Sequence, residues 1–257
     1  MIELRTQQQL RPVQNLKFCC ICGEPLNNDQ DRQHVPPKAI FSKADRSSPL
    51  ILPSHPKCNS AQSPFDEVIG QLLALVYGKY PAAKDLKLEA EFFPVTGGDF
   101  TWGVKNLPLE LIIFRWIRCF HAALYHEFLP DRGGRVYAPF PAGEQIDGRV
   151  VYENIYLSRL ELTYLFKQQM KAGLTDSVTC YNEKCQYRCT WLKSDDGRPF
   201  CLFALRLYNW EELGDIHNHP PMGCVGIYLA EIPAIASRGT RLEIPASNFV
   251  PLDPFAP

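Results

Sequence analysis

Two short pairs of metal-binding side chains lie in the first quarter of this chain. Cys19 and Cys22 form a C-x2-C motif, and His55 and Cys58 form an H-x2-C motif further along. Thiolate and imidazole groups in two such pairs are typical of a tetrahedral zinc site. Four protein ligands leave the ion no open position, so the zinc would be structural rather than catalytic. We therefore predict a zinc site of three cysteines and one histidine that joins the two ends of a segment with few apolar residues.

The ten cysteines of the chain are many for a protein in a reducing compartment, where thiols bind metals or lie buried more often than they form disulfides. We expect a cytoplasmic protein for two reasons. No apolar run reaches the roughly 18 residues that a membrane span needs, and the N-terminus lacks the apolar region of a signal peptide. Cys20 lies next to the first motif and is an alternative zinc ligand to Cys19.

A second group of cysteines lies in the C-terminal half. If residues 177–191 form one strand, its alternation puts Cys180 on the opposite face from Cys185 and Cys189. We therefore expect these cysteines, and Cys201 on the next strand, to be small buried groups rather than a second metal site. No nucleophile motif, phosphate-binding loop or pair of carboxylates in the sequence marks an active site in that half.

Between the two metal-binding motifs lies the sequence DRQHVPPKAIF, from Asp31 to Phe41. A zinc motif comes first, then a strand with a His-Val-x-Pro pattern at His34, then a second motif that runs into Asn59 and a helix. This order resembles the HNH endonuclease family, over residues 19–70. The resemblance implies a ββα-metal fold and a metal-dependent endonuclease that hydrolyses nucleic-acid phosphodiester bonds. A role in phage defence or self-killing, as in many small bacterial HNH proteins, is also implied.

The resemblance further implies roles for single residues. His34 would be the general base, because phosphodiester hydrolysis needs a water molecule that is deprotonated near the phosphorus. Asn59 stands where the family has its last His or Asn, and it would offer its side-chain oxygen to a catalytic Mg2+ or Mn2+ ion. That cation would stabilise the leaving oxygen.

This chain departs from the family pattern at the residue before the catalytic histidine. The family usually has Asp or Glu there as a ligand to the catalytic cation, and this chain has Gln33. A neutral amide is a weaker ligand than a carboxylate, but Asp31 lies on the same side of the predicted strand and could replace it. The family's central Asn has no clear counterpart between Phe41 and Pro53. The alternative interpretation is therefore a catalytically inactive, zinc-containing module that binds nucleic acid or a partner.

Positive charge is concentrated around this motif, although the formal net charge of the whole chain is −1. Residues 31–58 contain two acidic side chains, Asp31 and Asp45. They contain five basic side chains, which are Arg32, Lys38, Lys43, Arg46 and Lys57. Such a patch suits the phosphates of a nucleic acid, and a solvated loop face is the other explanation. We predict a nucleic-acid partner, DNA more than RNA, and no membrane association.

Apolar periodicity and turn residues predict the remaining elements. Residues 1–16, which are polar and rich in glutamine, are expected to be a loose arm. A helix is predicted to begin after a turn at residues 60–63. A longer amphipathic helix is predicted over residues 108–128, with Arg115 and Arg118 on its solvated face. The other predicted elements are two strands within residues 84–104, a weaker helix over 157–171, and strands over 177–191, 199–208 and 225–232, with a hairpin turn at 194–197.

These elements predict an α+β protein in two domains. Residues 1–82 would form an N-terminal, zinc-stapled ββα-metal module. Residues 83–257 would form a larger α+β domain with the long amphipathic helix and an antiparallel sheet, serving as an accessory or target-recognition domain. Because 46% of the residues are hydrophobic, the chain has enough apolar material for a packed core.

Overall fold

The fold is mixed α and β, as predicted, with one large sheet and several helices. The computed structural model describes residues 1–76, 87–94, 100–104, 109–130, 134–137, 145–146, 149–150, 165–193, 197, 199–208, 222–229 and 240–241. None of the described helices is long and apolar enough to cross a membrane.

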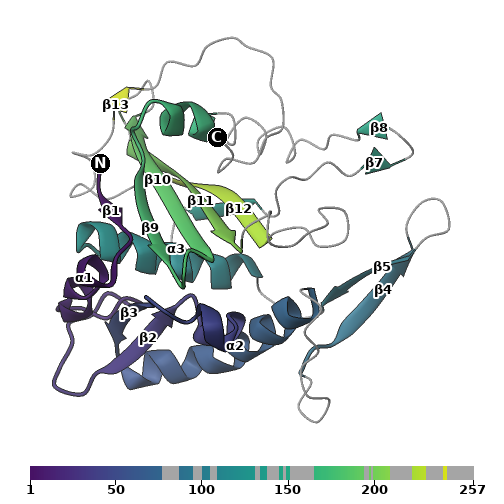
Figure 1. Cartoon of the computed structure of the whole chain (residues 1–257), viewed down its shortest axis with the longest axis horizontal. Helices are drawn as coiled ribbons and strands as arrows, with labels where there is room; N and C mark the ends of the chain where they lie inside the picture. The colour runs from purple at the N-terminus through teal and green to yellow at the C-terminus, as the bar shows by residue number, and fades with distance from the viewer. Residues whose placement is uncertain are drawn as a thin grey trace.

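A seven-stranded sheet forms the centre of the described fold (Figure 1). Its strands run in the order β1–β9–β10–β11–β12–β6, and β13 pairs with the end of β10. The β1–β9 pair is parallel, and the pairs from β9 to β6 are antiparallel. These strands are β1 (Glu3–Leu4), β6 (Gly134–Tyr137), β9 (Asp176–Cys180), β10 (Cys185–Lys193), β11 (Pro199–Leu207), β12 (Met222–Leu229) and β13 (Thr240–Arg241).

The predicted long helix is α3 (Leu109–Tyr125), and it packs against this sheet. The Phe120 ring stacks on the Tyr187 ring of β10 with centroids 4.7 Å apart, and the Phe114 ring stacks on the Tyr228 ring of β12 at 6.0 Å. The predicted apolar stripe of the helix is buried, and it includes Ile113, Trp116, Ile117, Phe120 and Leu124. Burial of such a stripe is the main source of stability for a helix of this length.

A β-hairpin followed by a helix contains the predicted site. The hairpin strands are β2 (Asp31–Val35) and β3 (Leu50–Ser54), which are antiparallel, and the helix is α2 (Pro56–Val76). Between the strands lie two 3-10 turns, η2 (Lys38–Ile40) and η3 (Lys43–Asp45). In Figure 1 the hairpin and α2 lie below α3, with the large sheet above it. Alternate hairpin residues Val35, Leu50 and Leu52 are buried.

One hydrophobic core joins the two predicted domains within the described residues. It contains Leu10, Leu52 and Ile69 from the N-terminal part, together with Trp116 and Tyr187 from the C-terminal part. The domain boundary at residue 82 lies outside the described residues, so the division into two domains stays a prediction. The ββα part and the sheet nevertheless bury their apolar side chains against each other.

The N-terminal residues are not the loose arm that their composition predicts. They form β1, the short helix α1 (Gln7–Leu10) and the 3-10 turn η1 (Pro12–Asn15). Leu10, Val13 and Leu16 are buried, and the three-residue spacing places them on one side of these turns. The prediction failed because these few apolar residues among many polar ones anchor the segment in the core.

The helix of the predicted module starts earlier than expected. α2 begins at Pro56 and runs through residues 60–63 and through Pro64 to Val76. Proline suits the first position of a helix, because its missing N–H would have no intrahelical partner there. The Asn59 amide already donates to the His55 carbonyl oxygen at 3.0 Å, as helix geometry requires. The predicted turn at residues 60–63 is therefore wrong.

Most predicted strands are confirmed, with one correction. β4 (Ala90–Pro94) and β5 (Phe100–Val104) form an antiparallel pair, and β11 matches its predicted strand. β12 overlaps the strand predicted over residues 225–232, of which 230–232 lie outside the described residues, as do 194–196 of the predicted hairpin turn. The single strand predicted over residues 177–191 is instead the hairpin β9–β10, with a turn at residues 181–184. Residues 165–171 are helical, while residues 157–164 of that predicted helix lie outside the described residues. A further short pair is β7 (Gln145–Ile146) and β8 (Arg149–Val150).

Arg115 and Arg118 do not lie on a solvated helix face, so that prediction is wrong. Arg115 is 5% exposed and forms an ion pair with Asp66 of α2. Arg118 donates to the backbone carbonyl oxygens of Ile21 and Leu129, at 2.6 and 2.8 Å. Arg115 is buried and Arg118 is partly buried, and both link α3 to its neighbours.

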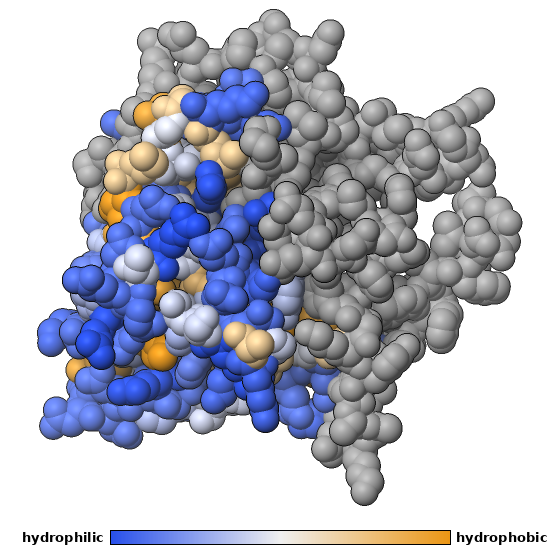
Figure 2. All heavy atoms as spheres, in the orientation of Figure 1, coloured by the Kyte–Doolittle hydropathy of each residue, from blue (hydrophilic) through white to orange (hydrophobic). Residues whose placement is uncertain are grey.

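The surface view shows where the described chain meets solvent. On the face shown in Figure 2, the described surface is mostly hydrophilic, and hydrophobic residues form small separate spots. Large apolar side chains that are exposed, such as Leu111 at 71% and Leu174 at 54%, lie on different elements. Scattered exposed apolar residues are ordinary in folded proteins and do not mark a docking surface.

Candidate metal centre and adjoining polar site

Four potential metal ligands converge between the two predicted motifs. The ligand atoms of Cys19, Cys22, His55 and Cys58 all lie within 4.8 Å of one another. Cys22 Sγ and His55 Nδ1 are 3.4 Å apart, close to the roughly 3.5 Å expected for two ligands bonded to one tetrahedral zinc ion. This group could hold a metal such as zinc. Among the described residues, no other three Cys, His, Asp or Glu side chains converge in this way.

The local backbone brings the two cysteines of the first motif together. The Gly23 amide donates to the Cys19 carbonyl oxygen, and the Cys19 amide donates to the Glu24 carbonyl oxygen, both at 2.8 Å. Gly23 has a φ of +84°, which side-chain-bearing residues rarely adopt. A Cβ atom on Gly23 would also lie 2.5 Å from the ring of Phe128. Glycine is therefore required at this turn for two independent reasons.

His55 is oriented in the way that metal-bound histidines usually are. It lies between β3 and α2, and its Nε2 is 3.1 Å from the Pro25 carbonyl oxygen. A proton on Nε2 would be donated to that oxygen, which leaves the lone pair of Nδ1 directed at the thiols. The His55 backbone amide also donates to Cys19 Sγ at 3.4 Å. Cys58 follows in the first turn of α2, so the start of the helix fixes both ligands of the second motif.

The alternative ligand Cys20 does not join this group. It is 1% exposed, and the Cys119 thiol donates to its backbone carbonyl oxygen at 3.7 Å. The contact with Cys119 and then burial raise the pKa of the Cys20 thiol well above its ordinary value. Because Cys20 is not among the four residues whose ligand atoms converge, the geometry favours Cys19.

The C-terminal cysteines are buried, as expected, but one reason given for this expectation was wrong. Cys180 and Cys185 are direct partners across the β9–β10 hairpin, so they share a face of the sheet. Cys189 and Cys201 are buried on neighbouring strands. Burial raises the pKa of the thiols of Cys185 and Cys201 well above the ordinary value, so they behave as small apolar groups.

A polar contact joins β2 to the start of α2, next to the metal-binding group. Asn59 Nδ2 donates to Asp31 Oδ2 at 2.6 Å. This hydrogen bond, followed by one from the Arg32 amide, lowers the pKa of the Asp31 carboxyl group, which therefore stays ionised at neutral pH. Because Asn59 directly follows Cys58, the same helix turn positions both residues. The structure thus brings together two of the predicted catalytic-metal ligands.

His34 is half-buried on the opposite face of the hairpin from Gln33. Burial lowers the pKa of its imidazole, and the nearby cations of Lys38, Arg32 and Arg46 lower it further, while Asp31 raises it. The ring is therefore neutral at neutral pH, which is the form that accepts a proton. Its strand register pairs it with Ile51 on β3.

Gln33 points into the protein, 3% exposed, on the same face of the hairpin as Asp31. Its Nε2 donates to the His34 carbonyl oxygen at 3.0 Å, while its Oε1 is buried without a hydrogen-bond partner in the described part of the chain. It also contacts Asp66 of α2. Sequence reasoning did not identify Asp66 as part of this site. The available signal was its spacing from Gln62, because residues one helix turn apart share a face of the helix.

Three of the five predicted basic residues surround His34. Arg32, Lys38 and Arg46 lie close enough to affect the pKa of its ring, whereas Lys43 and Lys57 do not contribute. Arg32, Lys38, Lys43 and Lys57 are exposed, and Arg46 is half-buried with its Nε donating to the Phe41 carbonyl oxygen at 3.0 Å. Four of these side chains therefore face solvent, and Arg46 is held by a hydrogen bond to the backbone.

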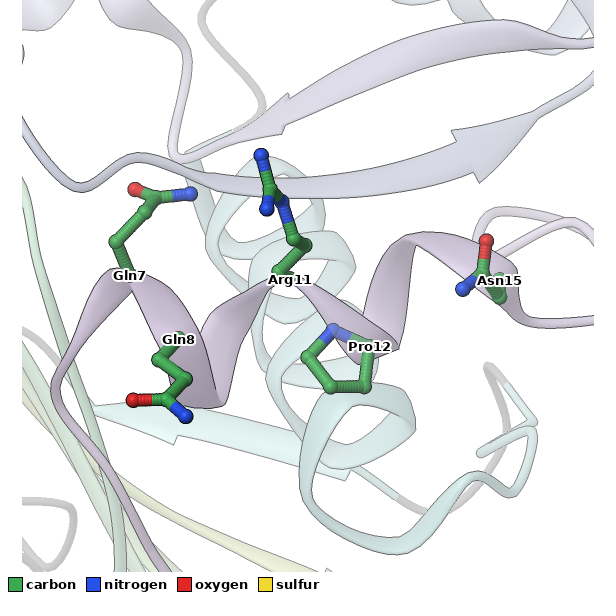
Figure 3. Close-up of a pocket in the computed structure, with 5 residues that line it drawn as sticks. All are labelled: Gln7, Gln8, Arg11, Pro12 and Asn15. Carbon is green, nitrogen blue, oxygen red and sulfur yellow. The ribbon is translucent and has the colours of Figure 1, made fainter.

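A surface hollow of about 470 Å³ lies elsewhere, on α1 and η1 (Figure 3). It is lined by Gln7, Gln8, Arg11, Pro12 and Asn15. None of the predicted site residues contributes to it, so it does not belong to the site around His34.

Comparison with known proteins finds no matching family model, no similar curated protein and no similar solved structure.

Proposed function

We propose that this chain is a metal-dependent endonuclease of the HNH type, which hydrolyses phosphodiester bonds of nucleic acid. The observation that supports this most is the contact between Asp31 on β2 and Asn59 in the first turn of α2. His34 lies on the same strand as Asp31, and the metal-binding group lies at the start of the same helix. A general base and two oxygen donors are the parts that metal-assisted phosphodiester hydrolysis uses.

His34 would act as the general base. Its lowered pKa keeps the ring neutral at neutral pH, so it can take a proton from the attacking water molecule. Its half-buried position leaves one side open to solvent, where water and a phosphate could approach. Removing a general base typically slows a reaction about 10²- to 10⁴-fold.

Asp31 and Asn59 would hold the catalytic Mg2+ or Mn2+ ion. Hard cations of this kind prefer carboxylate and amide oxygens, and Asp31 stays ionised because its pKa is lowered. When bound, the cation would supply the positive charge that stabilises the leaving oxygen. Gln33 fits this role less well, because its side chain is buried against Asp66.

The zinc would be structural, and it would be held by Cys19, Cys22, His55 and Cys58. These residues connect the loop before β2 to the first turn of α2, so the ion would fix Asn59 relative to Asp31. A small ββα unit needs such a link because it has few apolar residues of its own. We infer a cytoplasmic enzyme that acts on DNA more than RNA, with a role in phage defence implied only by the family resemblance.

The burial of Gln33 favours a second candidate function. If the catalytic cation needs a carboxylate at that position, the chain would bind nucleic acid through Arg32, Lys38 and Arg46 without cutting it. Both candidates predict the same structural zinc and the same salt-dependent binding of nucleic acid. They differ only in whether phosphodiester bonds are hydrolysed.

The test is cleavage of supercoiled plasmid and of labelled single- and double-stranded DNA and RNA, with Mg2+ or Mn2+. A chelator should stop cleavage, and zinc alone should not restore it. His34→Ala should lose about 10²- to 10⁴-fold in rate while it keeps its zinc and its fold. His126→Asn is the control, because His126 is an exposed histidine outside the site and asparagine tolerates its positive φ, so this variant should cut like the parent. A parent protein that binds nucleic acid but cuts none with any divalent cation would support the second candidate.

A further inference from the structure

Two tyrosines of the large sheet hold the segment that follows His34. The Tyr181 hydroxyl donates to the Pro36 carbonyl oxygen at 2.7 Å, and the Tyr208 hydroxyl donates to the Ile40 carbonyl oxygen at 2.8 Å. Tyr181 lies in the β9–β10 turn, and Tyr208 directly follows β11. Both hydroxyls are buried, so each satisfies a backbone carbonyl that water does not reach.

The aromatic rings of the same tyrosines enclose Phe41, which ends this segment. The rings of Phe41 and Tyr181 are stacked, with centroids 4.1 Å apart and planes 13° apart. The Tyr208 ring is tilted by 35° to the Phe41 ring, with centroids 5.8 Å apart. Phe41 is 2% exposed. The two hydrogen bonds and the stacked rings thus fix both ends of residues 36–41.

The junction between the loop of residues 36–48 and the sheet contains energetically unfavourable backbone conformations. Among the described residues, six non-glycine residues have a positive φ, and five of them lie here, namely Ser48, Tyr181, Asn182, Glu183 and Tyr208. Such conformations persist only where surrounding contacts enforce them, and they cluster at functional sites. Here the amides of Tyr181 and Asn182 donate to the carbonyl oxygens of Ser48 and Ser47, both at 3.1 Å. Arg5 pairs with Glu183 across the turn.

This loop places positive charge near His34, the candidate general base. Lys38 and Arg46 lie on it, and both are close enough to His34 to lower the pKa of its ring. Arg46 is itself fixed, because its Nε donates to the Phe41 carbonyl oxygen at 3.0 Å. The position of these cations relative to His34 therefore depends on contacts made by the sheet, far away in the sequence.

We propose that Tyr181 and Tyr208 are positioning residues that fix the cationic loop, residues 36–48, relative to His34, so that a backbone phosphate of a nucleic acid is bound in register with the imidazole. This inference rests on the proposed function. It gives the C-terminal sheet a direct part in the site instead of a separate accessory role. A loosened loop would still attract phosphate through its long cationic side chains. The phosphate would then be bound at the wrong position relative to the imidazole of His34.

The test compares Tyr181→Phe, Tyr208→Phe and the double variant with Tyr125→Phe as a matched control. Tyr125 also donates its hydroxyl to a side chain within the fold, Asp176 at 2.6 Å, and this hydroxyl lies 3.4 Å from Cys189 Sγ, so both of these neighbours belong to the sheet. Each change removes one hydroxyl, buried in Tyr181 and Tyr208 and part-buried in Tyr125, and keeps the ring. We expect Tyr181→Phe to lower kcat about 10- to 100-fold, because small misplacements of reacting groups cost this much, while KM changes less than about threefold. The control should keep both values.

Hydrogen exchange of residues 38–48 is a readout independent of cleavage. The amides of Ile40, Phe41 and Asp45 are hydrogen-bonded within the 3-10 turns, so a loosened loop would exchange them faster. Faster exchange and reduced kcat in Tyr181→Phe, with neither change in the control, would support the proposal. Exchange and kcat equal to those of the control would overturn it. A parent that cuts no nucleic acid would refute the proposed function and, with it, the catalytic register, whatever the exchange shows.

Discussion

The buried ion pair between α2 and α3 gives a prediction whose magnitude follows from its surroundings. The Arg115 and Asp66 side chains are 6% and 16% exposed, and Arg115 also donates to Gln62 Oε1 at 2.7 Å. Arg115→Met removes the cation and keeps a long apolar side chain. It leaves the Asp66 carboxylate buried without its counterion, which typically costs about 3–5 kcal/mol. We expect the free energy of unfolding to fall by this amount at neutral pH.

The loss of stability in Arg115→Met should depend on pH, and the titration of Asp66 sets the direction of this dependence. Burial raises the pKa of this carboxyl group, and the attraction of Arg115 opposes that shift. Without Arg115 the pKa rises further, so the folded protein takes up a proton at a higher pH than the unfolded chain, in which Asp titrates near pH 3.9. Protonation removes the need for a counterion. The destabilisation should therefore be full above the raised pKa and shrink as the pH falls through it.

Urea unfolding at pH 7 and pH 5 measures this effect. The double variant Arg115→Met/Asp66→Asn should be more stable than Arg115→Met at pH 7, because a neutral amide replaces the uncompensated charge. Asp66→Asn alone completes the double-mutant cycle. A loss below about 1 kcal/mol in Arg115→Met would contradict the assignment of this pair as a buried one. A double variant no more stable than Arg115→Met would contradict the role of charge.

Three further predictions concern the site. The parent protein, purified without added metal, should contain one zinc per chain by elemental analysis. The variant Cys58→Ser should lose the zinc, together with helical signal and resistance to proteolysis around residues 19–58. A parent protein without zinc would refute the site. The pH at which the cleavage rate falls to half should lie below about 6.5, the ordinary pKa of histidine, because the pKa of His34 is lowered; a rate already halved at pH 7 would exclude His34 as the base. Asn59→Ala should raise the Mg2+ concentration needed for half-maximal cleavage without loss of zinc, and an unchanged Mg2+ dependence would remove Asn59 from the cation site.

The ligand group and the main elements could be predicted from the sequence because neighbouring residues determine them. A C-x2-C motif with Gly23 and an H-x2-C motif at a helix start each bring two ligands together through local turn geometry. The apolar stripe of α3 and the antiparallel pairing of β10 with β11 likewise depend on residues close together in the chain. His34 and Asn59 were selected through the resemblance to the HNH family, and their roles stay predictions.

Only the tertiary structure decided which residues are paired over long distances. Arg115 and Arg118 have the spacing of a solvated helix face, but α2 and residues 21 and 129 supply their partners inside the fold. The turn at residues 181–184 contains no glycine or proline to mark it, and its positive φ values are enforced by Ser47 and Ser48, more than a hundred residues earlier. The hydroxyls of Tyr181 and Tyr208 find their acceptors beside His34 for the same reason. A sequence pattern specifies which groups need a partner, whereas packing decides which partner each group finds.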